Sequence, residues 1–410
     1  MSAIVSMPQS RAAAAALPAI AILVALVVVW RVVSNGTSAL LDGGAAAIGV
    51  RPPTSSAVET PEAAWRAQLA RYPVDHVALV MLALELERQG RSTDARAAMD
   101  EALQLAPADR RTLLEAGAFY LRTGDASKAL KLLRRAADFY PGVRERLWPV
   151  FAAALDGGRH DDFFAAVAGA NPNWWPEFFR HACEDSADVD ALQRLFAART
   201  GAGLVGADER RCLIGRLQQE KRWANAYQVW LNSLPPEQRQ RIGYVFNGSF
   251  DWPLSNVGFD WTIPAQEGVD VRVLPLEDAT GRHALRVAFT NKRWEGPPVQ
   301  QHLMVLPGRY RFEGRGRADG LQTWLGVQWG LYCLAGNGGR EQQFTRSGRF
   351  MGSSEWEEFG GDFTVLGDCP VQVLRLELAN PRPDAQAPGN VEVRLRGSVW
   401  FSDLRVRRLD

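Results

Sequence analysis

The sequence has few of the residues and motifs on which most catalytic and metal sites depend. Its 410 residues include four cysteines and five histidines. No two cysteines have the CxxC spacing of zinc or thioredoxin-like sites, and the histidines are dispersed. It contains no GxSxG, HExxH, P-loop or Rossmann fingerprint. These absences argue against metalloenzymes, serine hydrolases and nucleotide-binding enzymes, and no catalytic cofactor is expected.

Lysine is scarce as well, and the charges nearly cancel. Four lysines stand against 43 arginines, and the formal net charge is +1. An excess of arginine over lysine, with abundant alanine and glycine, is typical of GC-rich bacterial genomes. A chain so close to neutrality has no bulk attraction for nucleic acid, so no nucleic-acid partner is expected.

Paired carboxylates are also missing. A glycosidase needs two of them facing each other across a cleft. Glu357, Glu358, Asp362 and Asp368 cluster in the sequence, but Glu357 and Glu358 are adjacent and so point to opposite faces of a strand. We therefore predict that the protein is not an enzyme, with a cryptic glycan hydrolase as one alternative.

The longest apolar run lies near the N-terminus. From Ala12 to Trp30, 19 residues carry no charged or strongly polar side chain. As a helix this run would span about 28 Å, close to the hydrocarbon thickness of a bilayer. A cleaved signal peptide is the alternative, but the nearest small-residue cleavage run, at 45–47, lies far beyond Trp30. We predict a transmembrane anchor over residues 12–33, after an N-terminal tail of residues 1–11.

The charges beside this run suggest its orientation. Arg11 and the terminal amine precede it without any acid, which favours a cytoplasmic N-terminus. Residues 34–60 are rich in Gly, Ala, Ser, Thr and Pro and are expected to form a flexible linker. The expected location is the bacterial inner membrane, with one pass and the bulk of the chain in the periplasm.

Residues 61–240 contain a repeat of paired helices. Glycine, alanine and proline recur at an interval of 34 residues, with small residues where two helices would cross and proline where the second would end. The signature positions are Ala95, Ala102 and Pro107 in one copy and Gly117, Tyr120, Ala129, Ala136 and Pro141 in the next. On these residues the segment resembles the tetratricopeptide repeat (TPR) family.

The TPR resemblance implies an α-solenoid of about five helical hairpins. Such arrays do no chemistry and present a groove to a protein partner. The aromatic run Trp174, Trp175, Phe178 and Phe179 is expected to pack in the core rather than bind a partner. Cys183 and Cys212 are expected to be unpaired, buried small residues.

After residue 240 helical periodicity gives way to short alternating segments separated by Gly, Asn and Asp turns. The last two expected strands cover 391–395 and 399–406. Seven to ten strands over 241–410 predict an antiparallel β-sandwich of the jelly-roll kind. The expected fold class is therefore multidomain, α then β, behind one transmembrane helix.

Three segments of this region carry a family resemblance. They are FNGSFDW from Phe246, HLMVLPGRYRFEGRGRA from His302 and VWFSDLRV from Val399. They are similar to the entry, central hairpin and final strand of the jelly-roll carbohydrate-binding modules of glycoside hydrolases, which have a galactose-binding-like fold. The resemblance implies a polysaccharide ligand and a structural calcium ion, for which Asp403 is the one well-placed candidate ligand.

Strand alternation indicates which side chains could meet a glycan. In 325–333 the apolar phase should face the core and the other phase should face outward. The resulting candidate glycan-binding residues are Trp324, Gln328, Tyr332, Arg375 and Glu377. Aromatic faces and planar polar groups are what sugar recognition requires. The alternative is a solvated sheet face with incidental aromatic residues.

Cys333 and Cys369 flank a glycine-rich segment, and we predict a disulfide between them. It would close a loop of about 36 residues and would require an oxidising compartment, in agreement with export. The alternative is two unrelated buried thiols.

These features together predict a membrane-anchored envelope scaffold. The TPR groove would recruit a protein, and the sandwich would contact a glycan or an envelope protein. The combination resembles accessory proteins of exopolysaccharide or cell-envelope assembly. A lectin-like glycan-binding protein is the main alternative.

Overall fold

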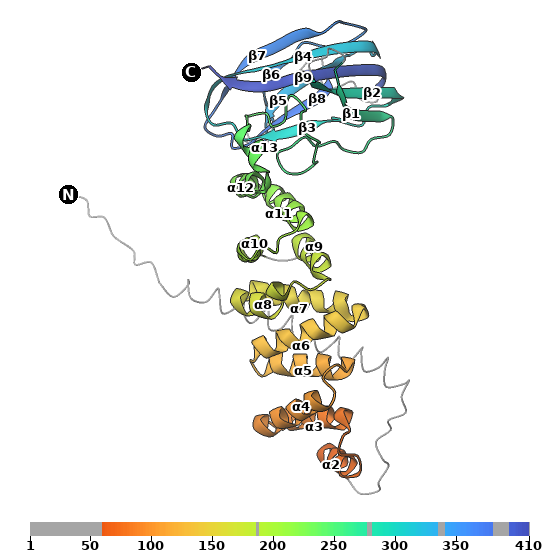
Figure 1. Cartoon of the computed structure of the whole chain (residues 1–410), viewed down its shortest axis with the longest axis vertical. Coiled ribbons are helices and arrows are strands. Elements are labelled where there is room, and N and C mark those ends of the chain that lie inside the picture. The colour runs from red at the N-terminus through yellow and green to blue at the C-terminus, as the bar shows by residue number, and fades with distance from the viewer. Residues whose placement is uncertain (1–59, 186–187, 277–280, 335–340, 380–392, 410) are drawn as a thin grey trace, which may run out of the picture. The chain divides into compact units, whose positions relative to one another are not determined.

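The computed structural model describes residues 60–185, 188–276, 281–334, 341–379 and 393–409. Helices fill the first half of this range and antiparallel strands the second, as predicted (Figure 1). The chain divides into two compact units, one ending at Cys212 and the other running from Leu213 to Asp410. This division falls earlier in the sequence than the domain boundary predicted at residue 240.

The predicted tail (1–11), anchor (12–33) and linker (34–60) lie outside the described residues, apart from Thr60. None of the described helices is both long enough and apolar enough to span a bilayer.

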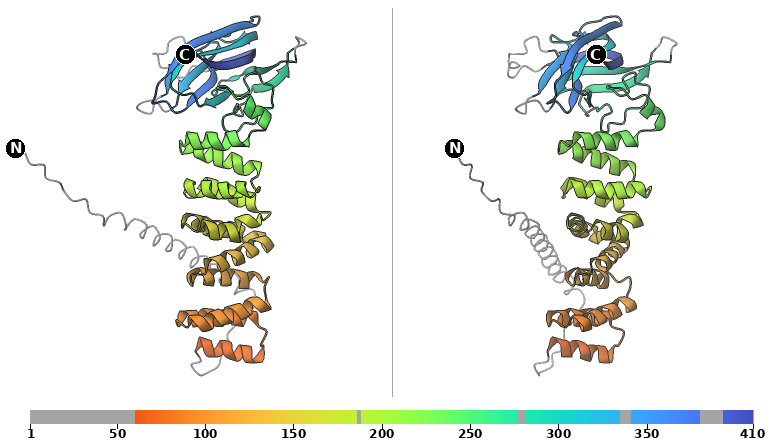
Figure 2. Two further views of the ribbon diagram at one scale, coloured as in Figure 1. Left: turned by 60° about the vertical axis from the view of Figure 1, so that its left-hand side comes forward. Right: turned by 90° about the vertical axis from the view of Figure 1, so that its left-hand side faces the viewer.

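The helices of the first unit form successive antiparallel pairs that stack on one another (Figure 2). They are α2 (Pro61–Arg71), α3 (His76–Arg88), α4 (Ser92–Leu105), α5 (Arg110–Arg122), α6 (Ala126–Phe139), α7 (Arg144–Asp156), α8 (His160–Ala166), α9 (Trp175–Asp185), α10 (Val189–Gly201) and α11 (Ala207–Gln219), the last of which crosses into the second unit.

Local signals set the ends of these helices. Asp75, Asp109 and Asp125 precede α3, α5 and α6, and each side chain accepts a hydrogen bond from a backbone N–H of the first turn. Gly90 and Gly124 lie between the two helices of their pairs with φ of +77° and +86°, which glycine adopts without strain. Sequence alone therefore accounts for the hairpin boundaries.

The small TPR signature residues occupy helix crossings. Gly117 on α5 is required there, because a Cβ atom would lie 2.5 Å from Cδ2 of Leu133 on α6. The other crossing positions are fully buried alanines, namely Ala95, Ala102, Ala129 and Ala136. The predicted packing role of these residues is confirmed.

Tyr120 fills the space between adjacent hairpins. Its ring is fully buried, and its hydroxyl donates to the carboxylate of Asp100. Lys128 binds the same carboxylate at 2.6 Å and lies 4.1 Å from the ring centroid. Pro107 follows the end of α4, and Pro141 follows the end of α6, as the repeat predicts.

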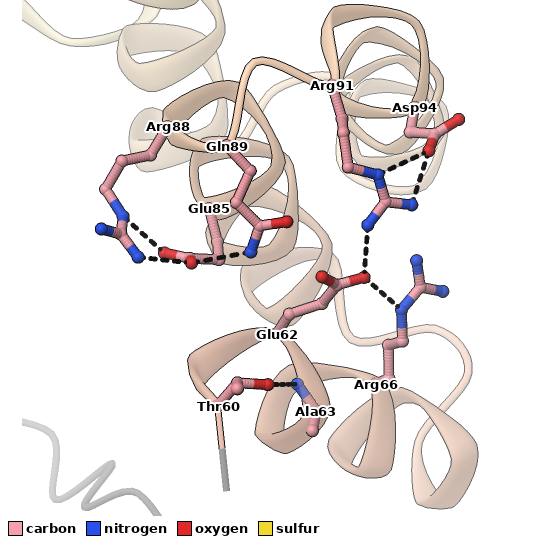
Figure 3. A network of polar contacts seen from close by, with 9 residues as sticks. All are labelled: Thr60, Glu62, Ala63, Arg66, Glu85, Arg88, Gln89, Arg91 and Asp94. Carbon is pink, nitrogen blue, oxygen red and sulfur yellow. Dashed lines mark hydrogen bonds and ion pairs between the residues drawn. The ribbon is translucent and has the colours of Figure 1, made fainter.

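Helix α2 is attached to its neighbours mainly through polar contacts (Figure 3). None of its residues is buried. Glu62 accepts hydrogen bonds from Arg66 at 2.9 Å and from Arg91 at 2.8 Å, and these two arginines lower its pKa. Exposed ion pairs of this kind contribute little to stability, so they add little to the attachment of α2.

The later helices of the unit pack around an aromatic core. Side chains of α7 and α8 surround Phe178, with ring centroids 5.6 to 5.8 Å away. The four aromatic residues of the run, Trp174, Trp175, Phe178 and Phe179, are at most 2% exposed. Their predicted packing role is confirmed.

A buried ion pair lies beside this aromatic core. The guanidinium of Arg199 binds both carboxylate oxygens of Glu209 at 3.0 Å and lies 4.2 Å from the ring of Trp175. It also donates to the side chain of Asn171 and to the carbonyl of Leu204. Arg199 is fully buried, so its charge depends on these partners.

Cys183 on α9 and Cys212 on α11 form a disulfide, so the prediction that they are unpaired was wrong. Their Cα atoms lie 6.1 Å apart, within the range that a disulfide can bridge. The pair is 29 residues apart in sequence and comes together only through tertiary packing.

In the second unit, α12 (Trp223–Ser233) and α13 (Pro236–Gln240) precede two antiparallel sheets with the orders β1-β2-β9-β4-β7 and β3-β8-β5-β6. The strands are β1 (Val269–Pro275), β2 (His283–Arg293), β3 (Gln300–Leu303), β4 (Gly308–Gln322), β5 (Val327–Cys333), β6 (Gln342–Arg346), β7 (Glu357–Val365), β8 (Gln372–Leu378) and β9 (Arg394–Arg408). Apolar side chains from both sheets share one core, which confirms the predicted sandwich.

Two strand predictions need correction. β9 is continuous where two strands were expected, because Gly397 (φ +104°) lets the backbone pass close to Gly320, with a shift of register against β4 between Asp319 and Gln322. β6 was not predicted, since its residues carry no clear apolar alternation.

The FNGSFDW segment has a structural role. The side-chain amide of Asn247 accepts from the backbone N–H of Trp252 at 3.1 Å and donates to its carbonyl at 2.8 Å. A Cβ atom at Gly248 would lie 1.8 Å from the carbonyl oxygen of Leu404, so only glycine fits where this segment meets β9. The motif therefore closes the sandwich and does not point to a ligand.

Candidate functional site

Four of the five candidate glycan-binding residues meet on the outer face of the four-stranded sheet. Gln328 and Tyr332 lie on β5, and Arg375 and Glu377 lie on the neighbouring strand β8. The alternate residues of β5, including Trp329 and Leu331, are buried in the core, as the alternation predicted. We call these four outer residues the β5–β8 strip.

Glu377 is the centre of the β5–β8 strip. Its Oε1 accepts hydrogen bonds from the amide of Gln328 at 3.2 Å and from the hydroxyl of Tyr332, and its Oε2 accepts from Nε of Arg375 at 3.2 Å. Arg375 also binds Glu341 at 2.9 Å, and its guanidinium lies 4.2 Å from the ring centroid of Tyr332. The strip is thus a connected network of donors and acceptors.

A glycine makes this network possible. Gly330 lies between Gln328 and Tyr332 on β5 and directly across from Arg375. A Cβ atom there would lie 2.5 Å from Cε2 of Tyr332 and 2.6 Å from Oε1 of Glu377. Sequence reasoning missed Gly330, although a glycine inside a strand is a known signal of close approach. It also missed Glu341, for which the sequence offers no signal.

The surroundings of the strip shift the pKa values of two of its groups, Tyr332 and Arg375. Burial, and then the hydrogen bond to Glu377, raise the pKa of Tyr332 to about 12, so its hydroxyl stays protonated at neutral pH. Burial lowers the pKa of Arg375, but Glu341 and Glu377 outweigh burial and raise it. The charges of Arg375 and Glu377 cancel, which suits a neutral, hydroxyl-rich ligand better than a charged one.

The strip differs from the expected flat aromatic surface. Gln328 and Tyr332 are only 6% and 8% exposed, and Arg375 covers one face of the Tyr332 ring. A sugar would therefore meet the polar edge of the network first, and it would reach the ring face only after Arg375 moves.

Trp324, the fifth candidate, does not lie on β5. It lies in the turn before the strand, which begins at Val327, and it is 56% exposed. Among the described contacts, no hydrogen bond or ring interaction joins it to the β5–β8 strip. Its exposure still makes it the most accessible tryptophan for a ligand in the described part of the sandwich.

The predicted disulfide is present, and the predicted calcium site is not supported. Cys333, at the end of β5, is bonded to Cys369, with their Cα atoms 5.8 Å apart. Asp403 lies 3.8 Å from the guanidinium of Arg282, a cation that disfavours a metal ion there. No group of three or more acidic, histidine or cysteine residues gathers as a metal site within the described ranges. The residues around Asp403 do not fit calcium.

A cleft of about 420 Å³ opens between α12 and β3 within the second unit. Its walls include Trp230, Phe259 and His302. Burial lowers the pKa of His302 to about 4, so its imidazole is neutral at pH 7. Trp230 and Phe259 are each 2% exposed and pack together at 5.6 Å. The aromatic side chains that line this cleft are therefore accounted for by the packing of α12 against the sandwich.

Charged side chains connect successive repeats in the helical unit. Arg122 on α5 binds Glu87 on α3 through two hydrogen bonds of 2.7 and 2.9 Å. Burial raises the pKa of Glu115, two helical turns before Arg122 on the same side of α5, although Arg111 and Arg122 oppose this shift. These groups are among the polar side chains that α3 and α5 carry.

Comparison with known proteins gives matches of different kinds, a family model for part of the helical half and solved structures of β-sheet modules. Residues 86–150 match the family model of the tetratricopeptide repeat, which confirms the predicted repeat over α4 to α6 and part of α7. No curated protein matches the chain.

Solved structures similar to the chain include carbohydrate-binding modules. A CBM4 module is 15% identical with a TM-score of 0.27, over 40% of this chain and 99% of that one. The CBM22-1 xylan-binding domain from Paenibacillus barcinonensis is 14% identical with a TM-score of 0.27, over 40% and 92%. A further CBM22 xylan-binding domain is 15% identical with a TM-score of 0.28, over 41% and 96%. Nothing about a ligand of this chain follows from likenesses of this size.

Proposed function

We propose that this protein is a non-enzymatic scaffold of the bacterial cell envelope. In this proposal residues 12–33 anchor it in the inner membrane, the helical repeats recruit a protein, and the sandwich contacts a neutral glycan. The observation that carries the glycan assignment is the β5–β8 strip, in which fixed donors and acceptors surround Glu377 on an outer sheet face. Exopolysaccharide or envelope polysaccharide assembly is the proposed setting.

Two disulfides support a location outside the cytosol. The chain has four cysteines, and they form the disulfides Cys183–Cys212 and Cys333–Cys369. Disulfides persist in oxidising compartments and are rare in the cytosol. Pairing of every cysteine therefore favours the orientation suggested by Arg11.

The helical unit supports the recruiting role. TPR arrays bind peptides or helices along the stacked repeats, and their stability comes from contacts between neighbouring units. The matched segment contains the hydrogen bond from Tyr120 to Asp100, which joins adjacent hairpins.

The glycan proposal predicts that Glu377→Gln weakens binding of a neutral polysaccharide by about tenfold or more, since charge-assisted hydrogen bonds are lost throughout the strip. Purified full-length protein would be titrated with soluble xylan and glucomannan by calorimetry. Trp324→Ala should weaken binding if the exposed tryptophan also contacts the chain.

Glu267→Gln is the matched control for this experiment. Glu267 is exposed and pairs with Lys292 away from the strip, so binding should not change. Saturable binding that only the strip variants lose would support the lectin-like role within the scaffold. Failure to bind any glycan would leave the sandwich as a protein-docking domain.

The export proposal predicts an active alkaline phosphatase when this enzyme is fused after residue 410. Phosphatase needs the oxidising periplasm to fold, whereas a fluorescent-protein fusion at the same site should be dark. A bright fluorescent fusion with inactive phosphatase would reverse the proposed topology and remove the support that the disulfides give to it.

A further inference from the structure

The outer face of the five-stranded sheet carries a row of alternating arginine and tryptophan side chains. Arg286 on β2 and Arg317 on β4 lie directly across from Trp400 on β9, one on each side. Their guanidinium carbons lie 5.7 and 4.7 Å from the Trp400 ring centroid. Arg315 and Arg317 also lie 5.6 and 5.7 Å from the ring of Trp356. We call these five residues the arginine–tryptophan ladder.

This sheet carries a surplus of positive charge in a nearly neutral chain. Its five strands contain thirteen Arg and Lys residues against seven Asp and Glu residues, a surplus of six, whereas the whole chain has a net charge of +1. The four strands of the opposite sheet hold two arginines and one glutamate. The two faces therefore differ in the charge of the ligand they suit.

Two arginines of the ladder lack acidic partners. Among the described residues, neither Arg315 nor Arg317 has a carboxylate within 4.0 Å, although Glu358 lies directly across from Arg315 on β7. By contrast, Arg405 and Arg407 on β9 both pair with Glu313, at 2.8 and 3.2 Å. Nε of Arg317 and the indole N–H of Trp400 are also buried without a hydrogen-bond acceptor.

We propose that the arginine–tryptophan ladder binds an acidic polysaccharide through the carboxylates of its uronic acid units. Arginine presents a planar fork that matches a carboxylate with two parallel hydrogen bonds. The tryptophan rings hold Arg286 and Arg317 in place, which lowers the entropy lost when they bind. This site is on a different sheet from the β5–β8 strip and does not depend on it.

The geometry disfavours a nucleic acid as the ligand. Proteins that bind single-stranded nucleic acids do so by stacking the bases on open aromatic faces. Arg286 and Arg317 flank the Trp400 ring from the strands on either side, which leaves little room for a base. The ladder therefore recognises charge and not flat rings, as a carboxylate-bearing polymer requires.

The test uses full-length protein in detergent with polygalacturonate as the probe and dextran as the neutral polymer. The double substitution R315Q/R317Q should weaken polygalacturonate binding by about tenfold or more, because two charge-assisted contacts are lost. Raising NaCl from about 50 to about 500 mM should weaken binding by the unaltered protein as well.

The matched control is R405Q/R407Q, which removes the same charge from the same sheet but from arginines already paired with Glu313. It should change binding by less than about twofold, because screened, paired charges contribute little. Equal loss in both double variants, no binding of polygalacturonate, or equally tight binding of double-stranded DNA would each overturn the proposal. R315K/R317K keeps the two positive charges but lacks the planar guanidinium groups, so it should also lose most of the affinity. This second variant keeps the test valid if R315Q/R317Q does not fold. If the protein does not bind xylan, or if Glu377→Gln does not weaken that binding, the outcome of the polygalacturonate experiment is unaffected.

Discussion

Glu209→Ala is expected to destabilise the helical unit by roughly 3–5 kcal/mol, because it leaves a buried cation without its counter-ion. Glu209 is 5% exposed and supplies both oxygens that bind Arg199, which is fully buried. Asn171 and Leu204 would still accept hydrogen bonds from the guanidinium, but neither carries a charge. Urea unfolding followed by far-ultraviolet circular dichroism measures the change.

Two variants test the physical reason. Glu85→Ala breaks a surface pair with Arg88, whose side chain is 70% exposed, and should change the free energy of unfolding by less than about 1 kcal/mol. The double variant R199M/E209L removes both charges and should cost less than Glu209→Ala alone. If the single variant loses less than about 1 kcal/mol, Arg199 does not depend on Glu209.

Removal of the Cys333–Cys369 disulfide should destabilise the sandwich by about 4 kcal/mol, because the unfolded chain regains the entropy of a long loop. The two cysteines are 36 residues apart in sequence. Cys333 directly follows Tyr332 at the end of β5, so C333A/C369A should also weaken glycan binding by the β5–β8 strip. Urea unfolding of oxidised protein, with and without reductant, compares the two states.

The second disulfide provides the control. C183A/C212A removes a link in the helical unit and should leave both glycan binding and the unfolding of the sandwich unchanged. A reductant that weakens neither unit would show that the bonds carry no stability, and the argument for an oxidising compartment would lose its thermodynamic basis.

Local patterns predicted much of the fold. The 34-residue interval placed Gly117 and the four alanines at helix crossings, because residues three or four apart on a helix share one face whatever its neighbours are. The alternation in β5 placed Trp329 in the core and Tyr332 on the opposite face of the sheet for a similar reason, since successive side chains of a strand point to opposite faces.

The candidate site was predicted in part. Gln328, Tyr332, Arg375 and Glu377 were assigned to one face by parity, and pairing of β5 with β8 brings them together. Trp324 was misplaced because the alternation was extended back to residue 324, three residues before the strand begins at Val327. Glu341 could not be predicted, because its contact with Arg375 crosses 34 residues of chain.

Sequence by itself therefore determined most of the order of helices and strands, the helix ends and the face on which side chains inside a strand lie, because backbone geometry within a few residues sets these. Tertiary structure alone decided that Cys183 bonds Cys212 and that Trp400 lies between Arg286 and Arg317. Those pairings depend on which helices and strands become neighbours. That choice is made by burial of one shared core, which no short stretch of sequence encodes.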